Sequence, residues 1–233
     1  MNPDLLPGAV WYAVFLFSTV LHEAAHAWSA HRMGDDTAFR GGQVSLNPWP
    51  HIRREPIGMV VVPILSWLLG GWMIGWASAP YDVAWALRHP RRAGLMALAG
   101  PAANLLLLLL AALLIRVGIE WNVLIQPGEI DSTHLTTAAV SGPFELGALL
   151  LSVMFSLNLL LFAFNLLPLP PLDGSSLPLL FLSKERAHAY STALQNPLLR
   201  IGGLIVAFKL TRPLFHPLFL LAANWVYPGA GYG

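Results

Sequence analysis

The chain has 233 residues, of which 56% are hydrophobic and only 11% are charged, with a net charge of +1 and no cysteine. A soluble domain carries about a quarter charged residues, so this composition indicates an integral membrane protein. The near-neutral charge gives no electrostatic basis for binding nucleic acid. Without cysteine, disulfides, iron–sulfur clusters and thiolate zinc sites are excluded, and any metal must be bound by His, Asp or Glu.

Apolar segments follow one another along the chain and predict its membrane crossings. They cover about 9–33, 57–79, 95–115, 146–167 and 198–227. A helix needs about 20 apolar residues to cross a bilayer, and each segment comes close to that length or exceeds it. The last segment carries Lys209, Arg212 and Pro213, so we expect a kinked span or two shorter pieces. The polar stretch that precedes it is expected to lie at the membrane surface.

Charged loops predict the orientation of these segments. Basic residues gather near 88–92 and 184–200, whereas the loop at 120–145 contains acids but no Lys or Arg. Because basic loops stay in the cytoplasm, the first two are predicted to be cytoplasmic and the third to lie outside. The segment 57–79 must then begin and end on the cytoplasmic side. A segment with both ends on one side of the membrane crosses it an even number of times or not at all, which favours a re-entrant hairpin, broken at Gly70-Gly71, over a single span.

The predicted fold class is therefore all-α, a polytopic membrane protein with about 4–6 transmembrane helices and one re-entrant hairpin. Gln43-Val44-Ser45-Leu46 alternates polar and apolar residues between turn signals, which predicts one short membrane-associated β-strand. We expect a single domain over 1–233, with a catalytic core at about 9–180 and a C-terminal membrane segment at about 198–227. No repeat or low-complexity tail interrupts it.

The first apolar segment contains His22-Glu23-Ala24-Ala25-His26. Residues four apart on a helix lie about 40° apart, one turn above the other, so both imidazoles can bind one ion. Glu23 falls on the same face and can point at the open position of that ion, which is the arrangement of zinc metalloproteases. Two buried histidines without a metal are the alternative. Ionisable groups inside an apolar helix are costly unless they have a partner or a role, which favours the metal.

A catalytic zinc needs a third protein ligand, and Asp173 is the strongest candidate. It follows the Pro-rich stretch that ends the 146–167 segment, and such non-helical backbone at membrane depth occurs where it is covered by protein or lines a wet cavity. The alternative is an Asp that caps the next helix. His51 is a weaker candidate that could approach the site, and the other histidines are expected at the surface.

These residues resemble the site-2 protease family of intramembrane zinc metalloproteases, in its short prokaryotic form without PDZ or CBS domains. The resemblance extends from about residue 10 to 180. It rests on three blocks in the correct order: His22-Glu23-Ala24-Ala25-His26, Ala99-Gly100-Pro101-Ala102-Ala103-Asn104, and the stretch from Asn165 to Gly174 that ends in Leu-Asp-Gly. The segment Arg53-Arg54-Glu55 departs from the shorter, acidic link that is usual before the next proline.

The resemblance implies one Zn²⁺ per chain, bound by His22, His26 and Asp173, with Glu23 as the catalytic carboxylate. Glu23 would act as general base and later protonate the leaving amine. Asn104 is a candidate donor to the developing oxyanion, although it could equally serve helix packing beside Gly100. The implied activity is regulated intramembrane proteolysis of a single-span membrane protein, whose unwound segment could pair with the 43–46 strand.

The expected location is the cell (inner or plasma) membrane, with the active site open toward the cytoplasm. Two alternatives remain at this stage. One is a non-catalytic zinc-binding membrane protein, either a metal transporter or a protease relic. The nearly uncharged middle spans and the retained Glu23 count against these. The other is a membrane zinc protease acting on prenylated peptides, against which the Pro-rich Leu-Asp-Gly block counts.

Overall fold

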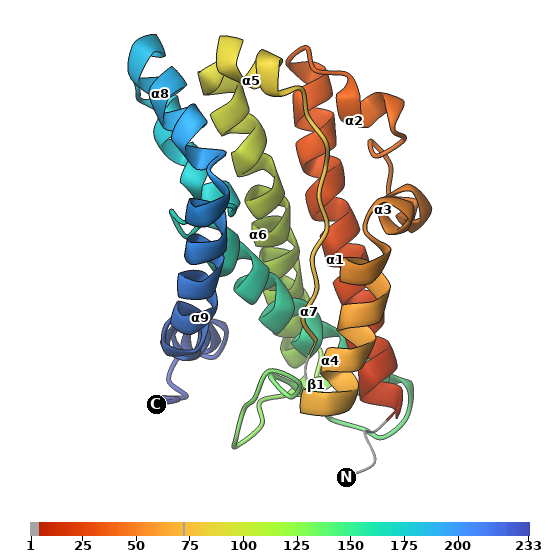
Figure 1. Cartoon of the computed structure of the whole chain (residues 1–233). Helices are drawn as coiled ribbons and strands as arrows, with labels where there is room; N and C mark the ends of the chain where they lie inside the picture. Colours follow the sequence, from red (N-terminus) through yellow and green to blue (C-terminus); the bar gives the residue numbers. More distant parts are fainter. Residues whose placement is uncertain (1–4, 72) are drawn as a thin grey trace.

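The computed structural model describes residues 5–71 and 73–233, and most of these residues are helical (Figure 1). Four helices are long and apolar enough to cross a membrane: α1, α6, α7 and α9. The described residues therefore confirm the all-α, multi-pass membrane fold. In chain order, the elements are α1 (Leu5–Arg32), α2 (Thr37–Arg40), α3 (Pro48–Arg54), a π-helical turn (Ile57–Val61), α4 (Val62–Gly70), α5 (Val83–Arg88), α6 (Pro90–Glu120), β1 (Leu124–Ile125), β2 (Thr137–Ala138), α7 (Pro143–Asn165), a 3₁₀ segment (Asp173–Leu180), α8 (Lys184–Leu194) and α9 (Pro197–Val226).

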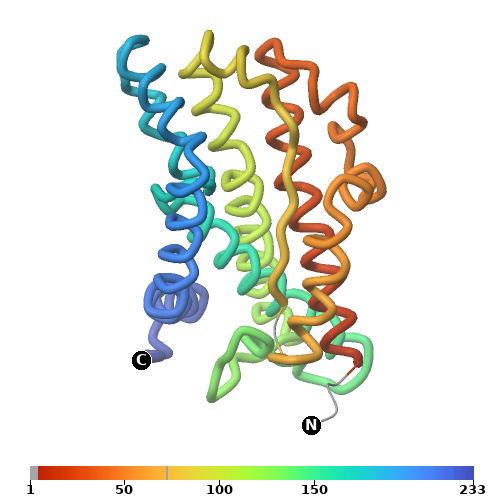
Figure 2. Tube along the Cα trace, viewed as in Figure 1, coloured from red at the N-terminus to blue at the C-terminus, as the bar shows by residue number. Residues whose placement is uncertain are grey.

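The helices α1, α6 and α7 pack together and form the centre of the molecule (Figure 2). Both α6 and α7 begin with a proline, which suits the first turn because its backbone nitrogen has no helical acceptor there. Lipid gives apolar helices little reason to associate, so close approach through small residues matters. On α6, Ala97, Gly100 and Ala103 are all buried, and α6 accordingly lies close to α1.

The segment 57–79 follows a hairpin path, as predicted from the requirement that both of its ends lie on the cytoplasmic side. Helix α4 ends at Gly70, and Gly71 adopts the left-handed conformation with φ of 72° that glycine tolerates. Figure 1 shows α4 running to one end of the molecule and residues 73–82 returning, extended, to α5 at the other end, where α2 also lies. The returning half is extended rather than helical, which the apolar sequence did not distinguish.

The strand predicted at 43–46 is wrong. These residues form bends, and Gly42 before them has a left-handed φ of 74°. A strand needs a hydrogen-bonded neighbour, and here Asn47 instead caps α3 by accepting a hydrogen bond from the Trp49 N–H at 3.0 Å. Among the described residues, the only strands are β1 and β2, two residues each, paired antiparallel in the acidic 120–145 loop.

The C-terminal apolar segment is one continuous helix, α9, with Pro213 and Pro217 inside it. Figures 1 and 2 show it bending, so that its second half is seen nearly end-on. Proline removes a helical hydrogen bond and clashes with the preceding turn, which accounts for the bend. The end of this helix packs against α6 and α7 through Phe219 and Ala223, whereas most of its remaining side chains are exposed.

Candidate metal centre

Helix α1 carries His22, Glu23 and His26 on one buried face. The exposed fractions of these residues are only 6%, 6% and 7%. The two imidazole rings are 4.6 Å apart between centroids, and their Nε2 atoms approach to 3.0 Å. The one-turn spacing therefore aims both nitrogens at the same point, as expected for two ligands of one ion.

Asp173 reaches this point from the other half of the chain. After α7 ends at Asn165, the Pro-rich stretch breaks the helix, and Asp173 begins the 3₁₀ segment. Its Oδ2 atom lies 3.1 Å from Nε2 of His22 and 3.3 Å from Nε2 of His26. The 3₁₀ segment packs against α6, and this contact holds Asp173 beside α1.

These three ligand atoms form a triangle with sides of 3.0, 3.1 and 3.3 Å. Ligands about 2.0–2.1 Å from a tetrahedral zinc are about 3.3–3.4 Å from one another. The triangle thus matches one face of a zinc coordination tetrahedron and leaves the fourth position for another ligand. Among the residues described, these are the three whose ligand atoms lie close enough to share an ion. The residues present fit the metal.

The second nitrogen of each imidazole is also engaged. Nδ1 of His22 lies 2.5 Å from Oδ1 of Asn104, and Nδ1 of His26 lies 2.7 Å from the Met96 carbonyl oxygen. Both acceptors are on α6. An oxygen acceptor at Nδ1 requires the proton there, which leaves the lone pair of Nε2 free for a metal. Helix α6 therefore fixes the tautomer of both histidines.

Asn104 continues this polar contact into α7. Its Nδ2 donates to Oδ1 of Asn158 at 2.9 Å, and Nδ2 of Asn158 donates to Oγ of Ser18 at 2.9 Å. The oxyanion role expected for Asn104 would need that same Nδ2 group. Sequence reasoning missed Asn158, although an amide within an apolar span is itself a signal of function. Asn104 thus lies between His22 on α1 and Asn158 on α7 and contacts both.

Gly100 supplies the space in which the histidines meet. A Cβ atom at this position would lie 2.5 Å from Nε2 of His22 and would also collide with Nε2 of His26. Real Cβ contacts are longer than 3.0 Å. Any larger residue would therefore fill the place where the ligand atoms converge. This close approach gives Gly100 a function at the site as well as in helix packing.

Glu23 is a buried residue whose carboxylate has no partner among the described residues. Within the part of the chain that the structure describes, its carboxylate makes no hydrogen bond and no ion pair. Ionisable side chains inside an apolar membrane-spanning helix are rare and usually face a partner or a cavity, which makes Glu23 a candidate for a chemical role at the ligand triangle. A carboxylate in this place can accept a proton from a water molecule at the open coordination position.

The other histidines lie apart from the ligand triangle. His51 is 1% exposed and its Nε2 lies 3.1 Å from the Ser45 carbonyl oxygen, but it does not join the described metal-binding group. His31 pairs with Asp36 at 2.7 Å near the end of α1. His134 lies in the acidic loop, 3.3 Å from Asp131. The site thus draws its nitrogen ligands from α1 alone.

Comparisons with known proteins agree with this geometry. The family model described as "Peptidase family M50" matches residues 10–208. Two relatives are named "Putative zinc metalloprotease": YwhC from Bacillus subtilis, 36% identical over 68% of this chain, and Rip2 from Mycolicibacterium smegmatis, 31% identical over 94%. The match spans 63% of the length of YwhC and 73% of that of Rip2. Rip2 from Mycobacterium tuberculosis is also 31% identical.

No solved structure gives a significant match. The family model nevertheless covers most of the chain, and the relatives are zinc metalloproteases by name. The three-block pattern and the buried ligand triangle agree with that family. The chain belongs to peptidase family M50, the site-2 protease family, and its metal is zinc.

Proposed function

We propose that this protein is an intramembrane zinc endopeptidase that cleaves single-span membrane proteins in or near their transmembrane segment, as a step of regulated intramembrane proteolysis. One observation carries the proposal: two of the three ligands of a zinc-sized triangle, together with Glu23, lie inside an apolar helix long enough to span a membrane. A metal site of this kind, placed at membrane depth, suits a substrate that is itself embedded in the bilayer.

The residues divide the chemistry between them. His22, His26 and Asp173 would hold the zinc, which when bound lowers the pKa of its water ligand and polarises a carbonyl group. Glu23 accepts a proton from the attacking water and later delivers it to the leaving amine. Asn104 and the Met96 carbonyl keep the two imidazoles in the orientation that this step requires.

The substrate must be locally unwound, because a helix hides its peptide bonds. The returning segment 73–79 offers an edge on which an extended chain can pair. The N–H of Ile74 is bound by Oγ of Ser66 at 2.9 Å, and that of Trp76 by the Gly58 carbonyl at 3.1 Å. In an extended chain, alternate N–H groups point in opposite directions.

The intervening N–H groups of Gly75 and Ala77 have no hydrogen-bond acceptor among the described residues. They therefore form a free edge that points away from α4. Gly75 lies against the ring of Phe15 on α1, so this edge runs beside the helix that bears the metal site. Strand addition to such an edge is a recurring way to bind an extended peptide, and it replaces the pairing expected at 43–46.

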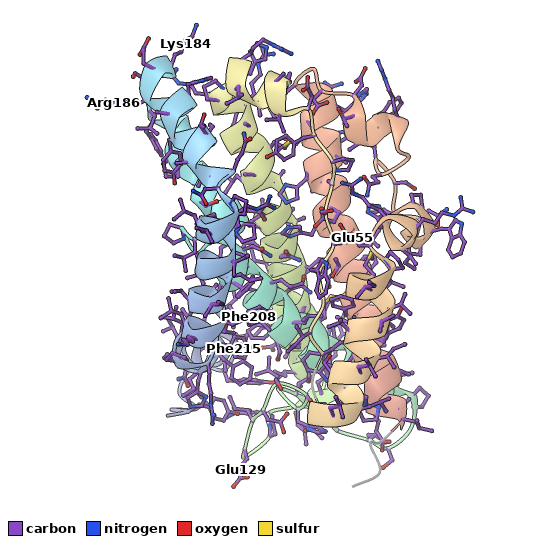
Figure 3. All side chains as sticks on the ribbon, in the orientation of Figure 1. Glu55, Glu129, Lys184, Arg186, Phe208 and Phe215 are labelled. Atoms are coloured by element: carbon purple, nitrogen blue, oxygen red, sulfur yellow. The ribbon has the colours of Figure 1, made fainter. Side chains whose placement is uncertain are left out.

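The charges at the two ends of the molecule support the orientation that we propose. Figure 3 shows Lys184 and Arg186 at one end and Glu129 at the other. Because basic residues face the cytoplasm, the end with Lys184 is cytoplasmic in this proposal. The membrane that we propose is the cell membrane. His26 is six residues before that end of α1, or about 9 Å along the helix. The active site therefore opens toward the cytoplasm.

A reporter assay tests the proposal. Wild type and Glu23→Gln are reconstituted in liposomes with a panel of single-span reporters, and zinc content is measured for both. We expect one zinc per chain in each protein and cleavage only by wild type. Equal zinc without cleavage by either protein contradicts the proposal. It would favour a metal transporter, which zinc uptake by the same liposomes detects.

A further inference from the structure

Asn158 is a fully buried amide within α7. It is 0% exposed, as are its neighbours Asn104 on α6 and Ser18 on α1. Its Nδ2 group donates to the Met154 carbonyl oxygen at 2.8 Å and to Oγ of Ser18 at 2.9 Å. Its Oδ1 atom accepts from Nδ2 of Asn104 at 2.9 Å. Both ends of this amide are therefore bound by groups of the helix bundle.

The Met154 carbonyl determines which way the Asn158 amide points. A backbone carbonyl oxygen only accepts hydrogen bonds, so the group that faces it must be the NH2 group of Asn158. Turning the amide by 180° would place its oxygen against the carbonyl and leave two buried acceptors without a donor between them, which costs free energy. Because Met154 lies one turn before Asn158 in the same helix, the backbone of α7 fixes this acceptor. Oδ1 of Asn158 therefore faces α6.

Asn104 takes its orientation from Asn158. Oδ1 of Asn158 is also only an acceptor, so Asn104 must present its Nδ2 group there and its Oδ1 atom on the opposite side. That side faces Nδ1 of His22, at 2.5 Å. An oxygen at Nδ1 keeps the proton of the neutral ring there and leaves the lone pair of Nε2 for a metal. With the Asn104 amide reversed, its NH2 group would face Nδ1 and favour the tautomer whose proton is on Nε2, which cannot bind a metal through that atom.

We propose that Asn158 is a positioning residue of the metal centre: it holds the Asn104 amide in the orientation that leaves Nε2 of His22 free for zinc. Within the described part of the chain, none of its side-chain hydrogen bonds reaches a metal ligand. It therefore acts on the metal through Asn104. This inference rests on the ligands assigned in the proposed function and not on the proposed cleavage, because it concerns how the protein binds its metal.

The Asn158→Leu variant tests this role, because leucine keeps the branched shape of the side chain and removes both polar groups. Nδ2 of Asn104 then has no acceptor, and its amide can turn. We expect zinc affinity, measured by competition with a fluorescent chelator in detergent, to fall about 10–100-fold, the usual cost of removing a support of a metal ligand. Asn158→Ala, which cannot overfill the space, should show the same loss. Ser156→Ala is the matched control on α7, since Ser156 is 1% exposed and its Oγ atom has no partner among the described residues; it should keep wild-type affinity.

A double-mutant cycle separates positioning from a general structural role. In the Asn104→Ala background, Asn158→Leu should change zinc affinity by less than about twofold, because the group through which it acts is gone. An effect of Asn158 on helix packing would persist in that background as a second loss of the same size.

Wild-type zinc affinity in both Asn158 variants overturns this inference and leaves the proposed ligands standing, and so does a second loss in the Asn104→Ala background. Loss of the folded, helical protein in both Asn158 variants also overturns it, because it assigns Asn158 a structural role. If wild type binds zinc no better than His22→Ala, the proposed ligands and this inference fall together.

Discussion

Replacing Gly100 with alanine should disable the metal site without unfolding the protein. The added Cβ would lie 2.5 Å from Nε2 of His22 and closer still to that of His26, where contacts under 3.0 Å do not occur. Helix α6 or the two imidazoles must therefore shift by at least about 0.5 Å, and overpacking of this kind costs about 1–3 kcal/mol. The ligand triangle, with sides of 3.0–3.3 Å, cannot absorb such a shift and keep its geometry.

Because perturbing the support of a metal ligand typically costs about 10–100-fold in affinity, we expect at least that loss for Gly100→Ala. Competition with a fluorescent zinc chelator in detergent measures it. Gly202→Ala on α9 is the matched control, since a Cβ there meets no atom within 4 Å. Wild-type zinc affinity in Gly100→Ala would refute the packing of α6 against the site described here.

Further predictions concern the supports of the site. Asn104→Ala removes the acceptor at 2.5 Å from Nδ1 of His22 and should lower zinc affinity about 10–100-fold, as measured by the same competition. Ser78→Ala removes a hydroxyl that donates to Glu55 at 2.6 Å; it should raise KM for a reporter several-fold by loosening the 73–79 edge, with zinc content unchanged. Removing zinc with a membrane-compatible chelator should abolish cleavage, and added zinc should restore it. Circular dichroism should show the helices intact, because α1, α6 and α7 pack together beyond the site.

Local patterns in the sequence predicted the parts of the fold that depend on nearby residues. The membrane helices follow from apolar runs of sufficient length, and the shared face of His22 and His26 follows from helical spacing. The hairpin at 57–79 followed from the basic loops, which place both of its ends on the cytoplasmic side. Each of these needs only a short window of sequence or a count of charges.

Contacts between segments that are distant in the sequence were harder to predict. Asp173 lies 151 residues from His22, and its Pro-rich setting and the family resemblance of the Leu-Asp-Gly block were what pointed to the site. The bond between Asn104 and Asn158 joins two spans whose relative rotation no local pattern gives. The 43–46 alternation failed because a strand depends on a neighbour that the segment does not have. The extended return at 73–82 was missed because an apolar run with glycines fits either a helix or an extended chain.

Zinc X-ray absorption spectroscopy tests most directly whether one ion is bound by residues from both halves of the chain. For wild type, the account predicts two imidazole nitrogens and at least one oxygen at about 2.0–2.2 Å from the zinc. Asp173→Ala should lose most of its zinc after dialysis, and any remaining ion should show a changed oxygen shell. Full zinc occupancy in Asp173→Ala, with an unaltered spectrum, would contradict the two-segment metal site.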